Sequence, residues 1–127
     1  MFIKRLLYLQ YKHSKPDNMQ KLFMAIWFRY LKTDWLIRRQ PSLKQVPFVL
    51  VLPDHGRLII TAANEPAKKQ GVYLGMLLAD ARAIIPELQF FDAEPARSAL
   101  LLPGLAEWCL RYTPHVATYC PDGLFLE

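Results

Sequence analysis

The sequence has few of the residues from which small metal sites and disulfide frameworks are built. It contains two cysteines, Cys109 and Cys120, with no Cys-x-x-Cys pair, and three scattered histidines. Zinc sites and disulfide scaffolds need closely spaced pairs of such residues. We therefore expect two reduced thiols, no structural metal and no cofactor.

Long apolar runs and the common catalytic motifs are also missing. No apolar stretch approaches the roughly 18 residues of a membrane-spanning helix, and the N-terminus has no small-residue cleavage site of a secretory signal. There is no Gly-x-Ser-x-Gly, no Walker glycine loop and no Rossmann glycine pattern after a strand. These absences predict a cytoplasmic protein with no membrane partner.

The charges are divided unevenly along the 127 residues. Residues 1–44 carry ten Lys or Arg against two acids, a balance of +8, whereas residues 45–127 carry six against nine, a balance of −3. A basic segment of this kind can follow a phosphate backbone. A solvated lysine-rich leader without a partner explains the same charges equally well.

The first half of the chain alternates apolar runs with turn residues. Residues 1–20 form a basic leader that we expect to be poorly ordered, although a short amphipathic helix is conceivable there. The run LFMAIWF, residues 22–28, predicts a central strand buried on both faces. Helical spacing follows over 31–39, and the runs 48–52 and 58–62 around Pro53-Asp54-His55-Gly56 predict an antiparallel hairpin.

The second half predicts helices and a further hairpin. Residues 63–70 and 77–85 fit two short helices, the first ended by Gly71 and the second by Pro86. Residues 96–112 have helical spacing interrupted at Pro103-Gly104, so only the part after this pair is expected to be regular helix. Residues 116–119 and 124–127 predict a second strand pair. The order of elements indicates an α+β fold with a helical insertion.

Three segments in this order resemble the Y-family translesion DNA polymerases, and among them the non-catalytic ImuB branch. They are MAIWF (24–28), TAANEPAKKQGVYLGMLLADARAIIPEL (61–88) and the turn LRYTP (110–114) with the hairpin after it. The second segment is the most specific, since it resembles the fingers signature of that family. The resemblance implies a partial palm, a ferredoxin-like antiparallel sheet, with a small helical fingers insertion.

The same resemblance implies an organisation for the chain. Residues 21–62 would form the first part of the palm, 63–95 the fingers-like helical segment, and 96–127 a helix and a palm hairpin. Family members continue beyond this point through more palm, a thumb and a further DNA-gripping domain. We therefore expect this chain to be a fragment or a truncated reading frame.

The carboxylates that the family uses for catalysis are mostly replaced. Nucleotidyl transfer needs two divalent cations held by several carboxylates. By resemblance these acids would stand at Ala25, Asp122 and Gly123, which we call the vestigial positions, so only Asp122 is an acid. We assign Asp122 to its turn, and we expect no catalytic residue and no metal ligand.

The fingers positions that approach a triphosphate in active relatives fall on Glu65 and Lys68. A carboxylate at the first of these would repel the triphosphate, so we expect weak nucleotide binding. Basic residues are the candidates for DNA contact. They are Lys21, Arg29, Lys32, Arg38, Arg39, Lys68 and Lys69.

The leading hypothesis is therefore a non-enzymatic, polymerase-like adaptor of bacterial DNA-damage tolerance and induced mutagenesis. By resemblance its partners would be DNA, an error-prone replicative-type DNA polymerase, the sliding clamp and the RecA-like protein ImuA. One alternative is a divergent Y-family polymerase whose acids have moved. Another is a nucleic-acid or membrane-surface binder built on the basic first 44 residues.

Overall fold

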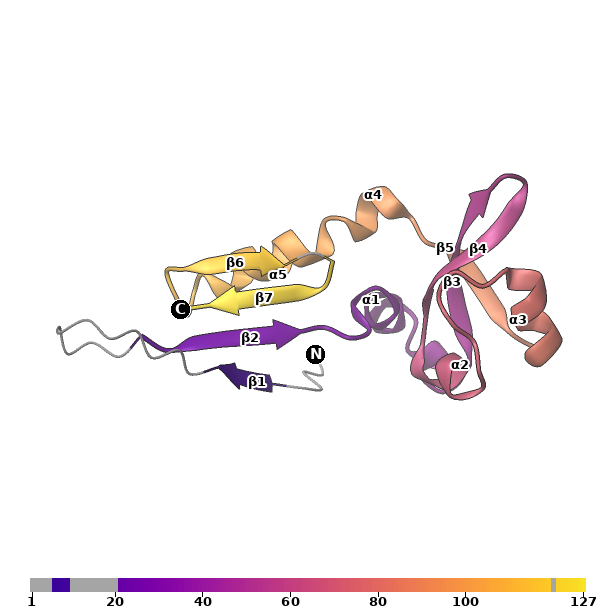
Figure 1. Cartoon of the computed structure of the whole chain (residues 1–127), viewed down its shortest axis with the longest axis horizontal. Coiled ribbons are helices and arrows are strands. Elements are labelled where there is room, and N and C mark those ends of the chain that lie inside the picture. The colour runs from indigo at the N-terminus through magenta and orange to yellow at the C-terminus, as the bar shows by residue number, and fades with distance from the viewer. Residues whose placement is uncertain (1–5, 10–20, 120) are drawn as a thin grey trace. The chain divides into compact units, whose positions relative to one another are not determined.

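The computed structural model describes residues 6–9, 21–119 and 121–127, and these form two compact units. The palm unit comprises the chain up to Arg29 together with Ala99–Glu127, and the inserted unit comprises Tyr30–Ser98. Figure 1 shows the elements of both. Within the described residues, no helix has the length and apolar character needed to cross a bilayer.

The palm unit contains a four-stranded antiparallel sheet in the order β1-β2-β7-β6 (Figure 1). The strands are β1 (Leu6–Leu9), β2 (Phe23–Trp27), β6 (Val116–Tyr119) and β7 (Gly123–Leu126). The predicted strand at 22–28 and the C-terminal hairpin are confirmed. Within the leader that was expected to be poorly ordered, Leu6–Leu9 pairs antiparallel with β2 as strand β1. The rest of the leader lies outside the described residues, as does Cys120.

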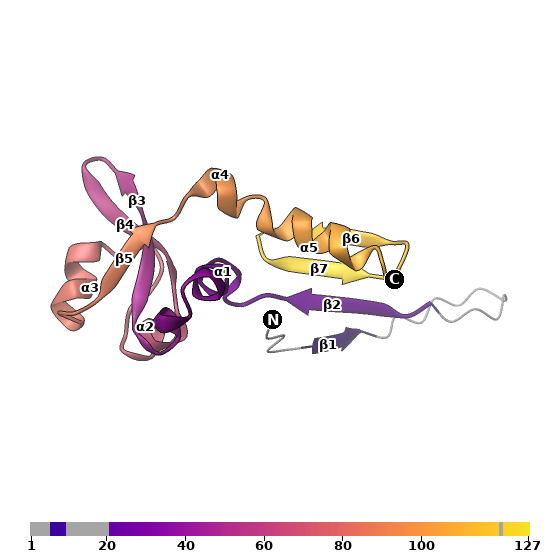
Figure 2. The ribbon, with the colours of Figure 1, turned by 180° about the vertical axis from the view of Figure 1, so that it is seen from behind.

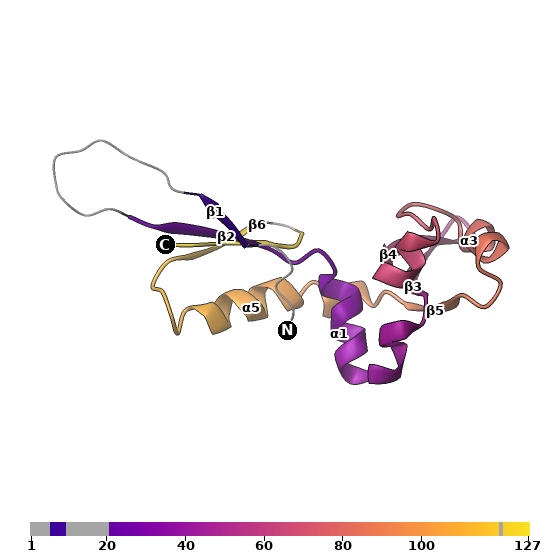
Figure 3. The ribbon, with the colours of Figure 1, turned by 90° about the horizontal axis from the view of Figure 1, so that it is seen from below.

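One face of this sheet is covered by helix α5 (Leu101–Cys109), which contacts β6 and β7 (Figures 2 and 3). Ile26 and Leu124 are paired across β2 and β7, so their side chains share a face, and both are buried. Trp27, on the opposite face, is 43% exposed. The prediction that this strand is buried on both faces is therefore wrong, since the sheet has a helix on one side.

Helix α5 passes through Pro103-Gly104 without the predicted break. Pro103 is the third residue of the helix, where the backbone N–H has no partner within the helix, so the missing donor costs no hydrogen bond. Gly104 donates its N–H to the carbonyl of Leu100 at 3.1 Å. The interruption lies earlier, between α4 (Pro95–Ser98) and Leu101.

The inserted unit is built on a three-stranded sheet in the order β4-β3-β5. The predicted hairpin is confirmed as β3 (Phe48–Asp54) and β4 (Arg57–Ala63), which pair antiparallel. The two residues of its turn, His55 and Gly56, have φ angles of 48° and 75°. Positive φ at both positions is what a type I′ hairpin turn requires.

Strand β5 (Gln89–Asp92) was not expected from the sequence, and it pairs parallel to β3. Its four residues are too few to show a clear alternation. The pairing is possible because the helical segment between β4 and β5 carries the chain back across the sheet. Backbone bonds at the strand ends, from Gln89 N–H to Pro47 and from Ala93 N–H to Val51, extend the contact.

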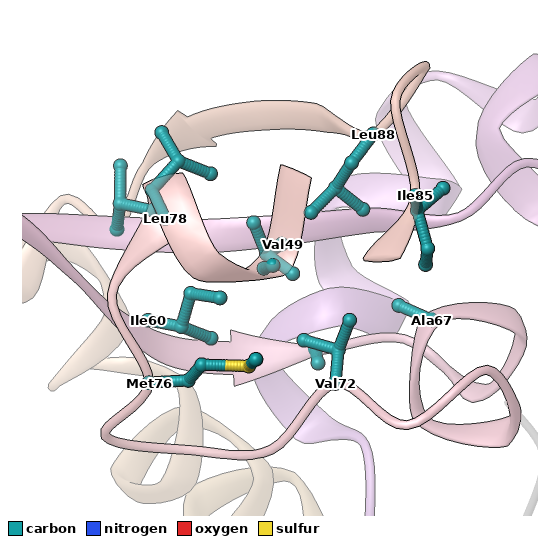
Figure 4. Packing of buried hydrophobic residues seen from close by; sticks show 11 residues of the cluster. Val49, Ile60, Ala67, Val72, Met76, Leu78, Ile85 and Leu88 are labelled. Carbon is teal, nitrogen blue, oxygen red and sulfur yellow. The ribbon is translucent and has the colours of Figure 1, made fainter. Parts of the chain in front are cut away.

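Strand β3 is the strand buried on both faces. Val49 and Val51 lie in a core with residues of β4, α2 (Glu65–Lys69) and α3 (Leu78–Ile84), as Figure 4 shows. Phe48 and Leu50 point the other way, into a second core with Leu43 of the 3-10 helix Pro41–Gln45. Leu36 and Ile37 of α1 (Leu31–Arg39) pack against this second core. The helix predicted at 31–39 is confirmed with the same bounds, and those predicted at 63–70 and 77–85 are confirmed with slightly shorter bounds.

The expected division of the chain at residues 62 and 95 is also corrected. The hairpin β3–β4 belongs to the inserted unit, because both faces of β3 are buried against elements between Leu36 and Ala93. The insertion is accordingly Tyr30–Ser98 and contains a sheet as well as helices. The palm unit takes only β1 and β2 from the N-terminal side and α5, β6 and β7 from the C-terminal side.

Candidate functional site

Two of the vestigial positions, Ala25 and Gly123, lie on the face of the palm sheet opposite Ile26 and Leu124. Ala25 on β2 is paired with Phe125 on β7, and Gly123 on β7 is paired with Trp27 on β2. Paired residues of antiparallel strands point to the same side. The structure therefore places Ala25 and Gly123 on one face, with aromatic residues paired to both.

Asp122 is held by the neighbouring strand. Its Oδ2 accepts a hydrogen bond from Trp27 Nε1 at 2.8 Å, and its backbone carbonyl accepts one from Phe28 N–H, also at 2.8 Å. The turn role predicted for Asp122 thus includes a contact that the sequence did not reveal. Nothing in the sequence around Trp27 indicates that its indole N–H bonds to a residue 95 positions later.

Aromatic groups occupy much of this face. Trp27, Tyr119 and Phe125 are 43%, 66% and 41% exposed. The rings of Tyr119 and Phe125 meet edge to face with centroids 5.8 Å apart. The face that resembles a metal-binding palm surface is therefore largely aromatic in this chain.

Gly123 stands at a close approach between β6 and β7. A Cβ atom added there would lie 3.1 Å from the carbonyl oxygen of Tyr119 and 3.3 Å from its Cβ. Such distances are shorter than ordinary van der Waals contact, so a side chain would force the hairpin to adjust. A glutamate at this position would therefore require a shift of a few tenths of an ångström at Tyr119.

Glu127 and Lys21 form an ion pair at the end of the same sheet. Lys21 Nζ lies 2.5 Å from Glu127 Oε1. The hydrogen bond from Lys21, with a further contribution from its charge and that of His115, lowers the pKa of Glu127. Lys21 thus has an anionic partner within the protein, and Arg29, in the same unit, also has an interaction partner.

Helix α2 positions the two lysines predicted on it. Asn64 is its N-cap and accepts a hydrogen bond from Ala67 N–H at 3.2 Å. Lys68 Nζ lies 4.9 Å from the centre of the Tyr30 ring, and Lys69 pairs with Glu65 at 3.6 Å. Glu65 thus partly neutralises the basic end of its own helix.

The remaining predicted cations lie on α1, and two of them line a pocket. Lys32 and Arg39 join Arg97 of α4 around a cavity of about 410 Å³ between α1 and the segment Phe91–Ser98. Trp35 lies among them, with the guanidinium carbons of Arg39 and Arg97 at 5.1 and 5.7 Å from its ring centre. Arg38 is exposed on the same helix. Sequence reasoning missed Trp35 and Arg97, although the spacing of Trp35 and Arg39, four residues apart on a helix, could have indicated the first contact.

The remaining titratable side chains that the structure describes form no cluster that could hold a metal ion, and they include one buried thiol. Among the described residues, no three His, Cys, Asp or Glu side chains are placed to hold a metal ion. Burial raises the pKa of the thiol of Cys109, the last residue of α5. A raised pKa disfavours the nucleophilic thiolate.

Known proteins with related sequences provide an independent comparison. The model of the impB/mucB/samB family matches residues 7–127. Protein ImuB of Caulobacter vibrioides is 42% identical over 57 residues, which are 45% of this chain and 12% of that protein. DNA polymerase IV of Serratia proteamaculans is 29% identical over 91 residues, or 72% of this chain and 26% of that protein. The chain thus spans about a quarter or less of the length of these relatives.

Solved structures show the same fold at lower identity. DinB from Sulfolobus solfataricus aligns with a TM-score of 0.74 at 18% identity, covering 83% of this chain and 31% of that chain. An insertion ternary complex of Dbh DNA polymerase aligns with a TM-score of 0.75, with the same coverage and identity. The chain therefore belongs to the impB/mucB/samB family, and its fold is that of a Y-family polymerase palm carrying an inserted α/β unit.

Proposed function

We propose that this chain is part of a polymerase-like adaptor without nucleotidyl-transfer activity, acting in bacterial DNA-damage tolerance and induced mutagenesis. The observation that carries the proposal is the face of the palm sheet around Ala25 and Gly123. Two of the three vestigial positions have no carboxylate, and Trp27, Tyr119 and Phe125 surround them.

This face has too few carboxylates to balance the charge of two divalent metal ions. Two divalent cations carry +4 between them and bind stably only when several oxygen ligands share that charge. Asp122 is a single carboxylate, and one of its oxygens already accepts the Trp27 indole N–H. Loss of the metals removes the positioning and the electrostatic stabilisation that supply most of the rate in phosphoryl transfer.

The α2 helix gives a second argument in the same direction. Glu65 stands where active relatives are expected to present a tyrosine to the triphosphate, and its carboxylate pairs with Lys69. A negative group at this place opposes a triphosphate, and it reduces the positive field of the neighbouring lysine. Nucleotide binding at the fingers position is accordingly expected to be weak.

DNA is the proposed direct partner, reached through the basic residues predicted from the sequence. Binding of this kind does not depend on the DNA sequence and weakens as salt is added. The logarithm of the binding constant falls with the logarithm of the salt concentration with a slope of about −0.7 per phosphate contact on single strands. The error-prone replicative-type polymerase, the sliding clamp and ImuA are proposed as protein partners of the longer protein. Titration of a labelled single strand at several salt concentrations tests the first partner, and binding independent of salt would contradict it.

The absence of catalysis is tested by primer extension. Residues 21–127 are joined to the remaining sequence of the Serratia DNA polymerase IV relative, and the intact relative is the positive control. We expect no extension by the chimera with Mg²⁺ or with Mn²⁺, which tolerates poorer geometry. Restoring acids by Ala25→Asp with Gly123→Glu is expected to leave it inactive, because Glu65 still opposes the triphosphate and the residues around the restored acids are not arranged to hold a metal.

A divergent active polymerase is the second candidate, and the match to DNA polymerase IV over 72% of this chain favours it. The same assay separates the two. Templated incorporation by the unmodified chimera that Asp122→Asn abolishes would replace the adaptor proposal with this one. Incorporation that Asp122→Asn leaves unchanged would point to a contaminating polymerase.

A further inference from the structure

The pocket beside Trp35 in the inserted unit has the composition of an anion site. Its floor is apolar, formed by Leu36, Leu50, Phe91 and Ala93, and its polar lining includes three cationic side chains. These cations are Lys32, Arg39 and Arg97. At about 410 Å³ its volume is within the range of small-molecule sites.

The two arginines are held in place by the same aromatic ring. Arg39 reaches Trp35 from one turn along α1, whereas Arg97 reaches it from α4. A guanidinium stacked on an aromatic ring keeps its N–H groups available at the edge, and it loses less conformational freedom when an anion binds. Trp35 therefore lies beside two guanidinium groups that come from segments about 60 residues apart in sequence.

The carboxylates of the pocket are already engaged by their neighbours. Asp92 Oδ1 accepts the backbone N–H of Glu94 at 2.7 Å, and Glu94 Oε2 accepts Arg97 Nη1 at 3.1 Å. Glu94 has a φ of 45°, a strained conformation for a side-chain-bearing residue. Among the described residues, no carboxylate lies within ion-pair distance of Lys32 or Arg39.

The donors favour an anion with several oxygens. Arginine forks match phosphate geometry, and the lysine adds a point charge. Gln40 and Ser98 also line the pocket and carry hydrogen-bonding groups. We propose that this pocket binds a phosphate group, carried either by a single-stranded nucleic acid or by a free nucleotide.

This inference deepens the DNA contact proposed above and rests on it for the strand as a ligand. The inference adds that one phosphate group binds in the defined pocket lined by residues of α1 and α4. The lysines of α2 do not line this pocket. Loss of this site leaves general electrostatic binding in place, so the two proposals can fail separately.

The experiment follows the indole N–H resonance of Trp35 by NMR in the full 127-residue chain. Trp27→Phe and Trp108→Phe remove the other two indoles. The probes are a dodecathymidylate, deoxyadenosine triphosphate, inorganic phosphate and, as a non-phosphate anion, a hexaglutamate peptide. We expect a saturable shift with the oligonucleotide, the nucleotide or both, and inorganic phosphate should compete.

Variants with a matched control decide whether the pocket is responsible. Arg39→Gln and Arg97→Gln should each weaken binding about tenfold, as loss of a charged hydrogen bond implies. Arg82→Gln removes an equal charge stacked on an aromatic ring, 5.5 Å from Phe90 on a surface outside the pocket, and should change binding less than twofold. Arg39→Lys should retain part of the affinity, and circular dichroism verifies the fold of each variant.

The results distinguish a free nucleotide from a nucleic-acid strand as the ligand, and they show whether the pocket binds phosphate at all. Competition by the nucleotide at equal phosphate concentration identifies a free nucleotide as ligand, whereas a preference for the oligonucleotide identifies a strand. Equal losses in Arg39→Gln and Arg82→Gln, no shift of Trp35, or an equal response to hexaglutamate would each overturn the proposal. Salt-dependent DNA binding that persists unchanged in Arg39→Gln and Arg97→Gln would overturn the pocket and retain the DNA contact.

Discussion

Asn64 is the buried polar residue on which the start of β3 and the start of α2 both depend. It is 2% exposed, and its Oδ1 accepts hydrogen bonds from Phe48 N–H at 3.1 Å and Ala67 N–H at 3.2 Å. Its Nδ2 donates to the Val46 carbonyl at 2.7 Å. We predict that Asn64→Ala strongly destabilises the inserted unit.

The magnitude follows from the three contacts. Loss of an N-cap costs about 1 kcal/mol. The buried N–H of Phe48 would be left without its side-chain partner, which costs about 2 kcal/mol. The Val46 carbonyl is partly accessible and adds little. The expected loss is about 3 kcal/mol, a large fraction of the 5–15 kcal/mol typical of a domain.

The assay is urea unfolding followed by the fluorescence of Trp35 in the chain with Trp27→Phe and Trp108→Phe. With a slope of about 2 kcal/mol per molar urea, the midpoint should fall by about 1.5 M. Asn64→Asp keeps an acceptor for both N–H groups and should lie between the wild type and Asn64→Ala. The exposed Gln70→Ala, at the other end of α2, is the control and should cost less than about 0.5 kcal/mol.

A loss of unfolding free energy below about 1 kcal/mol for Asn64→Ala would contradict this prediction. It would mean that water reaches Phe48 N–H, or that α2 forms without its cap. A loss of similar size in Gln70→Ala would show that the helix end alone, independent of the link to β3, limits stability.

Three further outcomes test other parts of the structure. Lys21→Gln should raise the pKa of Glu127 toward its ordinary value in an NMR titration. Because that pKa is lowered in the fold, the stability difference from the wild type should be present near neutral pH and vanish as the pH falls through the lowered pKa. Cys109 should react slowly with iodoacetamide near pH 8 and quickly in urea, read by peptide mass spectrometry, since burial raises its pKa; equal rates would contradict this. Gly123→Ala should cost about 1–3 kcal/mol by crowding Tyr119, and an unchanged thermal midpoint would show that the hairpin relaxes freely.

Features that depend only on residues close together in the chain could be predicted from the sequence. Gly56 in the turn between β3 and β4, the helix stop before Pro86 and the apolar run of β2 act within a few residues, so their patterns can be read directly. The family could be recognised for the same reason, because the fingers signature is one continuous segment. The replacement of acids by Ala25 and Gly123 is likewise visible in the residue letters.

Features that depend on segments far apart in the chain could be seen only in the folded structure. Strand β5 joins β3 only because α2 and α3 bury Val49 and Val51 on one face, and β1 completes a sheet whose other strands lie about 100 residues later. No local sequence pattern indicates that Arg97 lies against the Trp35 ring, that Trp27 donates a hydrogen bond to Asp122, or that Asn64 bonds to both β3 and α2. Long-range packing determines where such side chains lie. The hydrophobic period of a single sequence indicates whether a segment is helix or strand, but it does not show which other segments pack against it.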